Sequence, residues 1–146
     1  RLHLDYSKWI SPPPVTPTRD NALVDVEISK FGYEDDKKIE EYFKTEKWTS
    51  HQDRNDLGLR EHIGRPEGSE VSSAYESLDD KAKTPRGGRF IYLCRGPVNK
   101  TPYICHTYYQ HPRGPVITYY LSGQLLPHWK DVHEDVITLI NSFIQE

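Results

Sequence analysis

The chain has 146 residues, of which 35% are hydrophobic and 28% are charged, and its formal net charge is −3 at pH 7. This length is typical of one domain, and ten tyrosines, four phenylalanines and three tryptophans provide material for a core, which excludes wholesale disorder. The negative charge argues against nucleic-acid binding, because that activity needs a clustered excess of Lys and Arg. No apolar run approaches the roughly 20 residues of a transmembrane helix, so we predict no transmembrane segment.

The N-terminal segment is predicted to be an extended arm. Its run Ser11-Pro-Pro-Pro-Val-Thr-Pro17 suits neither a helix nor a sheet interior, because proline lacks an N–H and restricts the residue before it. We therefore assign residues 1–19 to a proline-rich arm and residues 20–146 to a single α+β domain, with Tyr6 and Trp9 as candidates for pinning the arm. Because the chain contains no methionine, we expect a processed product, and a signal or lipid anchor upstream is compatible with this.

In chain order, the domain is predicted to begin with a strand and a helix. Val24, Val26 and Ile28 alternate with polar residues, which predicts a half-buried strand. Residues 34–47 then show one apolar face at helical spacing. Five further strands are predicted from short apolar stretches bounded by turn signals, and they cover residues 57–63, 70–76, 89–95, 103–110 and 116–122.

The clearest predicted helix lies at the C-terminus, over residues 127–145. Trp129, Val132, Val136 and Ile140 recur there at spacings of three and four, which is the apolar stripe of an amphipathic helix. The order strand, helix, run of strands, helix favours an antiparallel sheet over an alternating parallel one. The predicted fold is therefore α+β, with an antiparallel sheet of about five or six strands and with an N-terminal-half helix and a C-terminal helix packed on it.

Both cysteines, Cys94 and Cys105, lie in neighbouring predicted strands. If the hairpin turns at residues 99–100, Cys94 lies directly opposite Cys105 and Leu93 lies opposite His106, which brings the two thiols close to disulfide geometry. We therefore predict a disulfide, and with it an oxidising compartment. Two reduced cysteines in a sheet remain the main alternative. A metal site is disfavoured, because zinc sites usually contain a cysteine pair separated by two to four residues.

No stretch of the chain is a specific catalytic or cofactor motif, so we assign no catalytic residue, no metal and no cofactor. His128 and His133 are five residues apart, which is not the spacing that places two ligands on one helix face. His106 follows Cys105 directly and points to the opposite side of a strand, which disfavours a Cys–His dyad. One open alternative is a small hydrolase that uses His106 with an acidic partner.

Tyrosines are concentrated in the last three predicted strands. Adjacent tyrosines place one ring on each face of a strand, so a sheet that is covered on one face leaves several rings at the other. Tyrosine is favoured at protein interfaces because it offers a large area with a polar tip. One interpretation is therefore a protein partner that binds an uncovered face, and the equal alternative is a sheet covered by helices on both faces or by the N-terminal arm; we predict a protein partner. The predicted partner-binding residues are Tyr92, Tyr108, Tyr109, Tyr119 and Tyr120.

Residues 87–143, from "GGRFIYLCRG" to "LINSF", resemble the closing module of small envelope proteins of Gram-negative bacteria, which include immunity proteins against type VI secretion toxins. In such proteins the strands end in a segment like residues 119–122, and a helix like residues 129–143 docks on the sheet. The sheet with a terminal helix is also similar to Mog1/PsbP-like domains. The resemblance implies a non-enzymatic, protein-binding lipoprotein or secreted domain of the periplasm, with a toxin or effector as partner. An envelope assembly factor that docks through its proline-rich arm is the alternative expectation.

Overall fold

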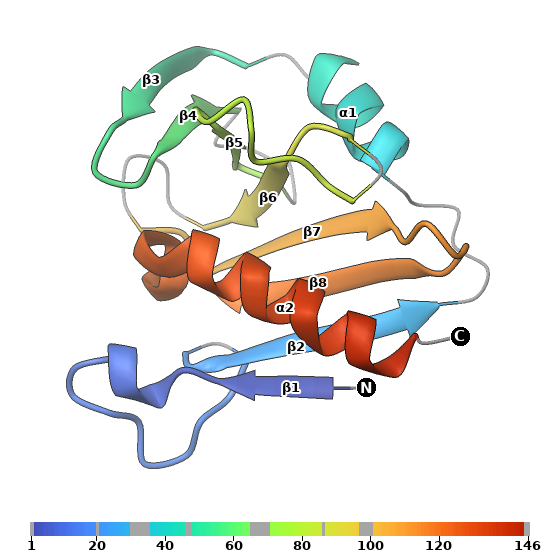
Figure 1. The fold of residues 1–146 in the computed structure, drawn as a ribbon. Helices are drawn as coiled ribbons and strands as arrows, with labels where there is room; N and C mark the ends of the chain where they lie inside the picture. Colours follow the sequence, from blue (N-terminus) through green and yellow to red (C-terminus); the bar gives the residue numbers. More distant parts are fainter. Residues whose placement is uncertain are drawn as a thin grey trace.

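The computed structural model describes residues 2–19, 21–29, 36–45, 48–64, 71–85, 87–96 and 101–144. These residues form one open α+β sheet in which every strand pairs antiparallel with its neighbours, in the order β1-β2-β8-β7-β6-β5-β4-β3 (Figure 1). The elements in chain order are β1 (Leu2–Asp5), the 3-10 helix η1 (Ser7–Trp9), β2 (Leu23–Ser29), α1 (Asp36–Thr45), β3 (Ser50–Arg54), β4 (Leu59–Ile63), β5 (Ser73–Ser77), β6 (Ile91–Arg95), β7 (Ile104–Gln110), β8 (Val116–Ser122), the 3-10 helix η2 (Gly123–His128) and α2 (Trp129–Phe143).

The antiparallel α+β prediction is confirmed, but the predicted number of strands is wrong. The described residues contain eight strands, and the two that the prediction did not include are the edge strands β1 and β3. The strand β1 lies inside the predicted arm, and β3 has the polar sequence SHQDR, of which four residues are exposed. Two helices were predicted to pack on the sheet, and this is only partly correct. The main helix is α2, with 15 residues, whereas α1 is a shorter helix of ten residues.

The N-terminal segment is attached to the body of the protein at two points beyond the pairing of β1 with β2. The Tyr6 hydroxyl donates a hydrogen bond of 2.8 Å to a carboxylate oxygen of Asp135 on α2. The Trp9 ring stacks on His128, with ring centroids 4.2 Å apart. The prediction that Tyr6 and Trp9 pin this segment is therefore confirmed.

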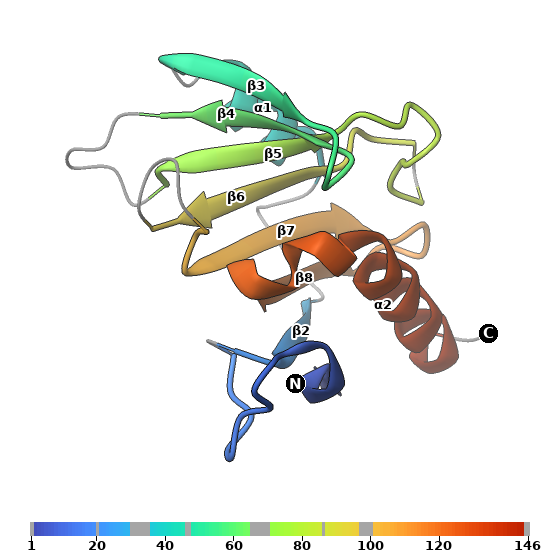
Figure 2. The same cartoon turned by 90° about the vertical axis from the view of Figure 1, so that its left-hand side faces the viewer.

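The helix α2 covers one face of the sheet, which we call the α2 face (Figures 1 and 2). Its residues at helical spacing are buried against side chains that alternate along the strands. The Trp129 indole N–H also donates to the Leu57 carbonyl at 2.6 Å, which ties the start of α2 to the connection between β3 and β4. The α2 residues of this core are Trp129, Val132, Val136 and Ile140.

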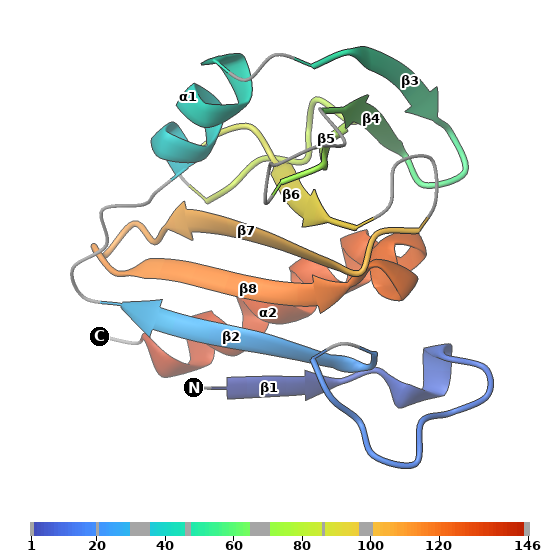
Figure 3. The same cartoon turned by 180° about the vertical axis from the view of Figure 1, so that it is seen from behind.

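The opposite face, which we call the α1 face, is covered only in part. Ile39 of α1 is buried in a second apolar cluster with Ala74, Ile91, Leu93, Tyr108 and Val116. On this side no described helix lies over the strands β7, β8, β2 and β1 away from that cluster (Figure 3). The sheet therefore has one face beneath α2 and one face that is half covered.

The predicted hairpin between β6 and β7 is present in the predicted register. Cys94 lies opposite Cys105, Leu93 lies opposite His106, and the two cysteines form a disulfide that is buried on the α2 face. The predicted turn at residues 99–100 lies outside the described residues. None of the described helices is long and apolar enough to cross a membrane.

Candidate functional site

The five predicted interface tyrosines are divided between the two faces of the sheet. Tyr92, Tyr109 and Tyr119 lie in the core beneath α2 with at most 1% of their surface exposed, and Tyr108 is 7% exposed in the cluster around α1. None of these four rings is exposed, because three lie on the face that α2 covers and Tyr108 lies where α1 packs on the other face. Tyr120 is half-buried on the α1 face.

The strand registers bring residues from all eight described strands into one row across the α1 face. Directly paired residues project their side chains to the same side of a sheet, so the row is continuous. Four of the seven histidines of the chain belong to it. We call this set the transverse row, and in spatial order it contains His3, Asp25, Tyr120, His106, Leu93, Ala74, His62 and His51.

One end of the transverse row lies on the part of the α1 face over which no described helix lies, and we call this end the open surface. His3 Nδ1 lies 2.5 Å from a carboxylate oxygen of Asp25, whose side chain is 8% exposed while that of His3 is 48% exposed. Next in the row, Tyr120 lies between two other groups. The Arg19 guanidinium carbon is 5.1 Å from the centroid of its ring, and the His106 ring is 5.5 Å away. The open surface, defined by these five residues, thus combines aromatic, cationic and acidic groups.

His106 is held in its neutral form. Burial lowers the pKa of His106 from its ordinary value of 6.5 to about 4, and the positive charge of Arg95 lowers it further in the same direction. Its ring neighbours are Tyr120 and Tyr108, at centroid distances of 5.5 and 6.1 Å. The carboxylate nearest to it along the row, Asp25, is paired with His3 instead.

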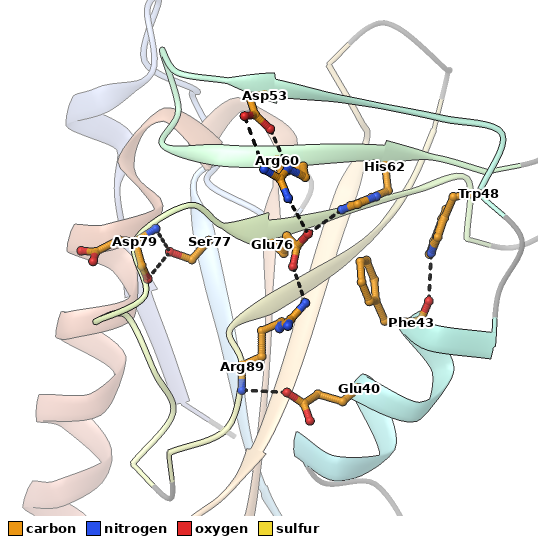
Figure 4. Close-up of polar contacts among 10 residues, drawn as sticks. All are labelled: Glu40, Phe43, Trp48, Asp53, Arg60, His62, Glu76, Ser77, Asp79 and Arg89. Atoms are coloured by element: carbon orange, nitrogen blue, oxygen red, sulfur yellow. Dashed lines mark hydrogen bonds and ion pairs between the residues drawn. The ribbon is translucent and has the colours of Figure 1, made fainter.

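At the covered end of the row, several charged groups converge on Glu76 of β5 (Figure 4). His62 Nε2 lies 2.8 Å from one carboxylate oxygen, and Arg89 Nη1 lies 2.7 Å from the other. Arg60 approaches the first oxygen to 3.9 Å and pairs with Asp53 at 2.6 Å. The hydrogen bond from His62 lowers the pKa of Glu76 against the opposing effect of burial, and the charges of Arg89 and Arg60 act in the same direction as His62.

Aromatic side chains enclose His62 beside this network. Its ring meets Phe43 edge to face at 4.7 Å and lies 6.1 Å from Trp48. Trp48 in turn donates its indole N–H to the Phe43 carbonyl at 2.9 Å, and the Arg89 backbone N–H donates to Glu40 of α1 at 3.1 Å (Figure 4). The network therefore joins α1 to the strands β4 and β5.

A polar cavity of about 350 Å³ adjoins the Glu76 network. Arg60, Lys83 and Arg89 line it together with Glu76, and the acidic Asp79 and Asp80 complete its charged wall. The three positive and three negative formal charges balance, so the cavity has no excess charge with which to select an anion or a cation. We assign the network a structural role, since its ion pairs link elements of the protein to one another.

The described residues contain no group of three or more His, Cys, Asp and Glu side chains that could hold a metal ion. The sequence singles out Tyr120 and His106 of the open surface, but it does not indicate the other residues of that surface or those of the Glu76 network. Those that lie on strands are brought together by cross-strand register, as His3 and Asp25 are, and this register cannot be read from a single strand. Arg19 and Arg89 lie outside the named strands. A comparison of the chain with protein-family models, with curated proteins and with solved structures found no match.

Proposed function

We propose that the protein is a non-enzymatic binding domain that recognises a protein partner through the open surface. The observation that carries this proposal is the half-buried Tyr120 ring, which lies close to Arg19 and to His106 on a part of the sheet that no described helix covers (Figure 3). Tyrosine and arginine are the residue types most often found at the energetic centres of protein interfaces.

The surroundings of Tyr120 also suit an interface. Its ring already contacts the Arg19 guanidinium and the His106 ring, which restricts its rotamers and reduces the side-chain entropy lost when a partner packs against it. The neighbouring His3, whose side chain is 48% exposed and pairs with the buried Asp25, supplies a hydrogen-bonding group at the rim, in keeping with the polar margin of typical interfaces.

The arrangement around His106 supports binding rather than hydrolysis. A hydrolase needs a histidine oriented by a carboxylate and placed beside a nucleophile or a water. His106 lies between the rings of Tyr120 and Tyr108, and the carboxylate of Asp25 serves His3.

The proposed compartment is oxidising, and the disulfide between Cys94 and Cys105 supports it. Within that setting we propose a cell-envelope or secreted location and, as the partner class to test first, a secreted toxin or effector that the domain inhibits. The proposed location and the proposed partner class both rest on the resemblance of residues 87–143 to envelope immunity proteins.

The experiment is an affinity capture from envelope and secreted fractions of the source cells with the purified protein, followed by calorimetry with the partner that is recovered. We expect Tyr120→Ala to weaken binding by more than about 1 kcal/mol, because it removes the central ring of the surface. The fold should persist, since Tyr120 is half-buried and lies outside both apolar core clusters.

Tyr103→Ala is the matched control. Tyr103 is 70% exposed and precedes β7, outside the open surface, so its removal should leave the affinity unchanged. Equal affinities for the Tyr120→Ala variant and the unmodified protein would remove the open surface from the proposal.

A further inference from the structure

A cavity of about 420 Å³ lies between α2, the connection from β7 to β8 and the segment that precedes β6. This volume falls within the range of roughly 300–1,000 Å³ that is typical of small-ligand sites. Pro85, Pro112 and Ile137 form apolar parts of its wall, and the rings of His111 and His133 add two flat surfaces. The cavity therefore suits a ligand with a compact apolar body.

The hydrogen bonds of His111 determine which group Asn141 offers to a ligand. The Arg113 backbone N–H donates to Nδ1 of His111 at 3.2 Å, so the ring carries its proton on Nε2 and donates it to Oδ1 of Asn141 at 3.1 Å. The Asn141 oxygen is thus engaged, and its NH₂ group has no hydrogen-bond partner among the described residues. One side of the wall therefore offers an unpaired donor.

His133 contributes its ring to the wall but no charge. The Tyr119 hydroxyl lies 3.1 Å from its Nδ1. Burial lowers the pKa of His133 from 6.5 to about 4, against the opposing effect of a hydrogen bond with the Lys83 backbone, so the ring is neutral at pH 7. Lys83 is then the one formally charged side chain among the described residues that line the cavity.

Lys83 also borders two neighbouring cavities that contain carboxylates. Two of these carboxylates have other cations beside them, since Glu76 pairs with Arg89 at 2.7 Å and Asp79 lies 3.7 Å from Lys130. The Lys83 ammonium forms no ion pair with a carboxylate in the described part of the chain. Taken together, the three cavities are lined by five lysine and arginine side chains and four carboxylates, which leaves one positive charge in excess.

We propose that this cavity binds a small carboxylate with a compact apolar body, with the carboxylate toward Lys83 and Asn141 and the body against Pro85, Pro112 and Ile137. The two side-chain groups of the wall that lack a partner are both donors, which suits acceptor oxygens, and the positive charge favours an anion over an alcohol or an amine. Two donors suffice for one carboxylate but leave the peptide groups of a longer chain without partners, which favours a free acid over a protein segment. The site lies beside α2, away from the open surface, so it stands or falls independently of the proposed function.

The test titrates four probes into the ¹⁵N-labelled protein, which are cyclohexanecarboxylate, cyclohexylmethanol, cyclohexylmethylammonium and acetate. The first three share one ring and differ in charge, whereas acetate keeps the charge and lacks the ring. With cyclohexanecarboxylate we expect saturable shifts at the amides of His111, Ile137 and Asn141. It should bind about fivefold more tightly than the alcohol, which is the upper range for an ion pair with an exposed lysine. The ammonium and acetate should bind least tightly.

Two variants test the donors. Lys83→Met, at an exposed position, removes the charge and keeps the length, so it should reduce the affinity for cyclohexanecarboxylate to that for the alcohol. Asn141→Asp keeps the oxygen that accepts from His111 but replaces the donor by a second carboxylate oxygen, so it should weaken carboxylate binding by at least the same factor. Lys130→Met is the matched control, because Lys130 lies beside Asp79 and does not line this cavity, and it should leave the affinity unchanged.

Four results would overturn the proposal. The first is the absence of saturable shifts with cyclohexanecarboxylate at these amides. The second is an alcohol or ammonium probe that binds as tightly as the carboxylate. The third is an unchanged affinity in Lys83→Met or in Asn141→Asp, and the fourth is a loss in Lys130→Met as large as that in Lys83→Met.

Discussion

Glu76 is a single buried carboxylate that accepts a hydrogen bond from His62 and another from Arg89. Each partner comes from a different part of the chain, β4 for His62 and the segment before β6 for Arg89. The Arg89 side chain is 47% exposed, whereas the His62 side chain is only 11% exposed. Solvent and salt therefore screen the interaction of Glu76 with His62 less than its interaction with Arg89.

We predict that Glu76→Gln lowers the free energy of unfolding by about 2 kcal/mol, the typical value for hydrogen bonds to a charged group. The glutamine side chain keeps the volume but presents an amide N–H₂ to groups that are themselves donors. Urea denaturation measures the change. Asp53→Asn, which removes a pair exposed to solvent, should have a far smaller effect, and equal effects of the two substitutions would contradict the structural role of Glu76.

The lowered pKa values of two buried histidines determine how the free energy of unfolding should depend on pH. Burial lowers the pKa of His106 and of His133 from 6.5 to about 4 in the folded protein. Between pH 6.5 and 4 the unfolded chain therefore binds protons that the folded protein does not, and the free energy of unfolding should fall as the pH falls through this window. Each histidine contributes at most about 1.4 kcal/mol per pH unit.

Glu76 acts in a lower window, because its pKa lies below its ordinary value of 4.5 and its contribution is lost only as the pH falls beneath that value. Denaturation at several pH values checks the sign and the window. His106→Gln should reduce the slope between pH 6.5 and 4, and an unchanged slope in this variant would show that His106 titrates normally in the folded state.

Among the elements, the hairpin of β6 and β7 carries the disulfide between Cys94 and Cys105, which are 11 residues apart. Closing a loop of this size stabilises a fold by about 3 kcal/mol in the chain-entropy model. We predict a loss of that size, measured by urea denaturation, in the Cys94→Ala/Cys105→Ala double variant. Reductant should destabilise the unmodified protein and leave the double variant unchanged, whereas a stable, unaffected reduced form would contradict the account.

The elements also differ in how far the sequence predicts them. The strand β8 and the helix α2 were predicted because Val116–Ser122 is a long β-branched and aromatic run and because α2 has a regular apolar stripe. The edge strand β3 was not, since its polar residues face solvent on an edge and show no alternation of apolar and polar side chains. The same holds for β1, whose Leu2 and Leu4 alternate over only four residues beside a proline-rich run.

Across the described molecule, the α2 face of the sheet is core, whereas the α1 face carries both an apolar cluster around Ile39 and the open surface. The residues Tyr109 and Tyr120 look equivalent in the sequence, yet Tyr109 lies in the core beneath α2 and the half-buried Tyr120 lies on the open surface. Which face a helix covers depends on how the chain crosses the sheet, so the exposure of these rings could not be predicted from strand periodicity alone. The transverse row, which is assembled from eight strands, also depends on how the chain crosses the sheet and could not be predicted from single strands.

Site-specific photo-crosslinking at residue 120 shows whether a protein partner contacts the open surface. A benzoylphenylalanine at this position, introduced in the source cells, should yield one discrete crosslinked species, identifiable by mass spectrometry. The same group at residue 103, which is exposed but lies outside the open surface, should yield none. Crosslinking to a single partner from residue 120 alone is the predicted result. No crosslink from residue 120, or the same product from both positions, would contradict the account.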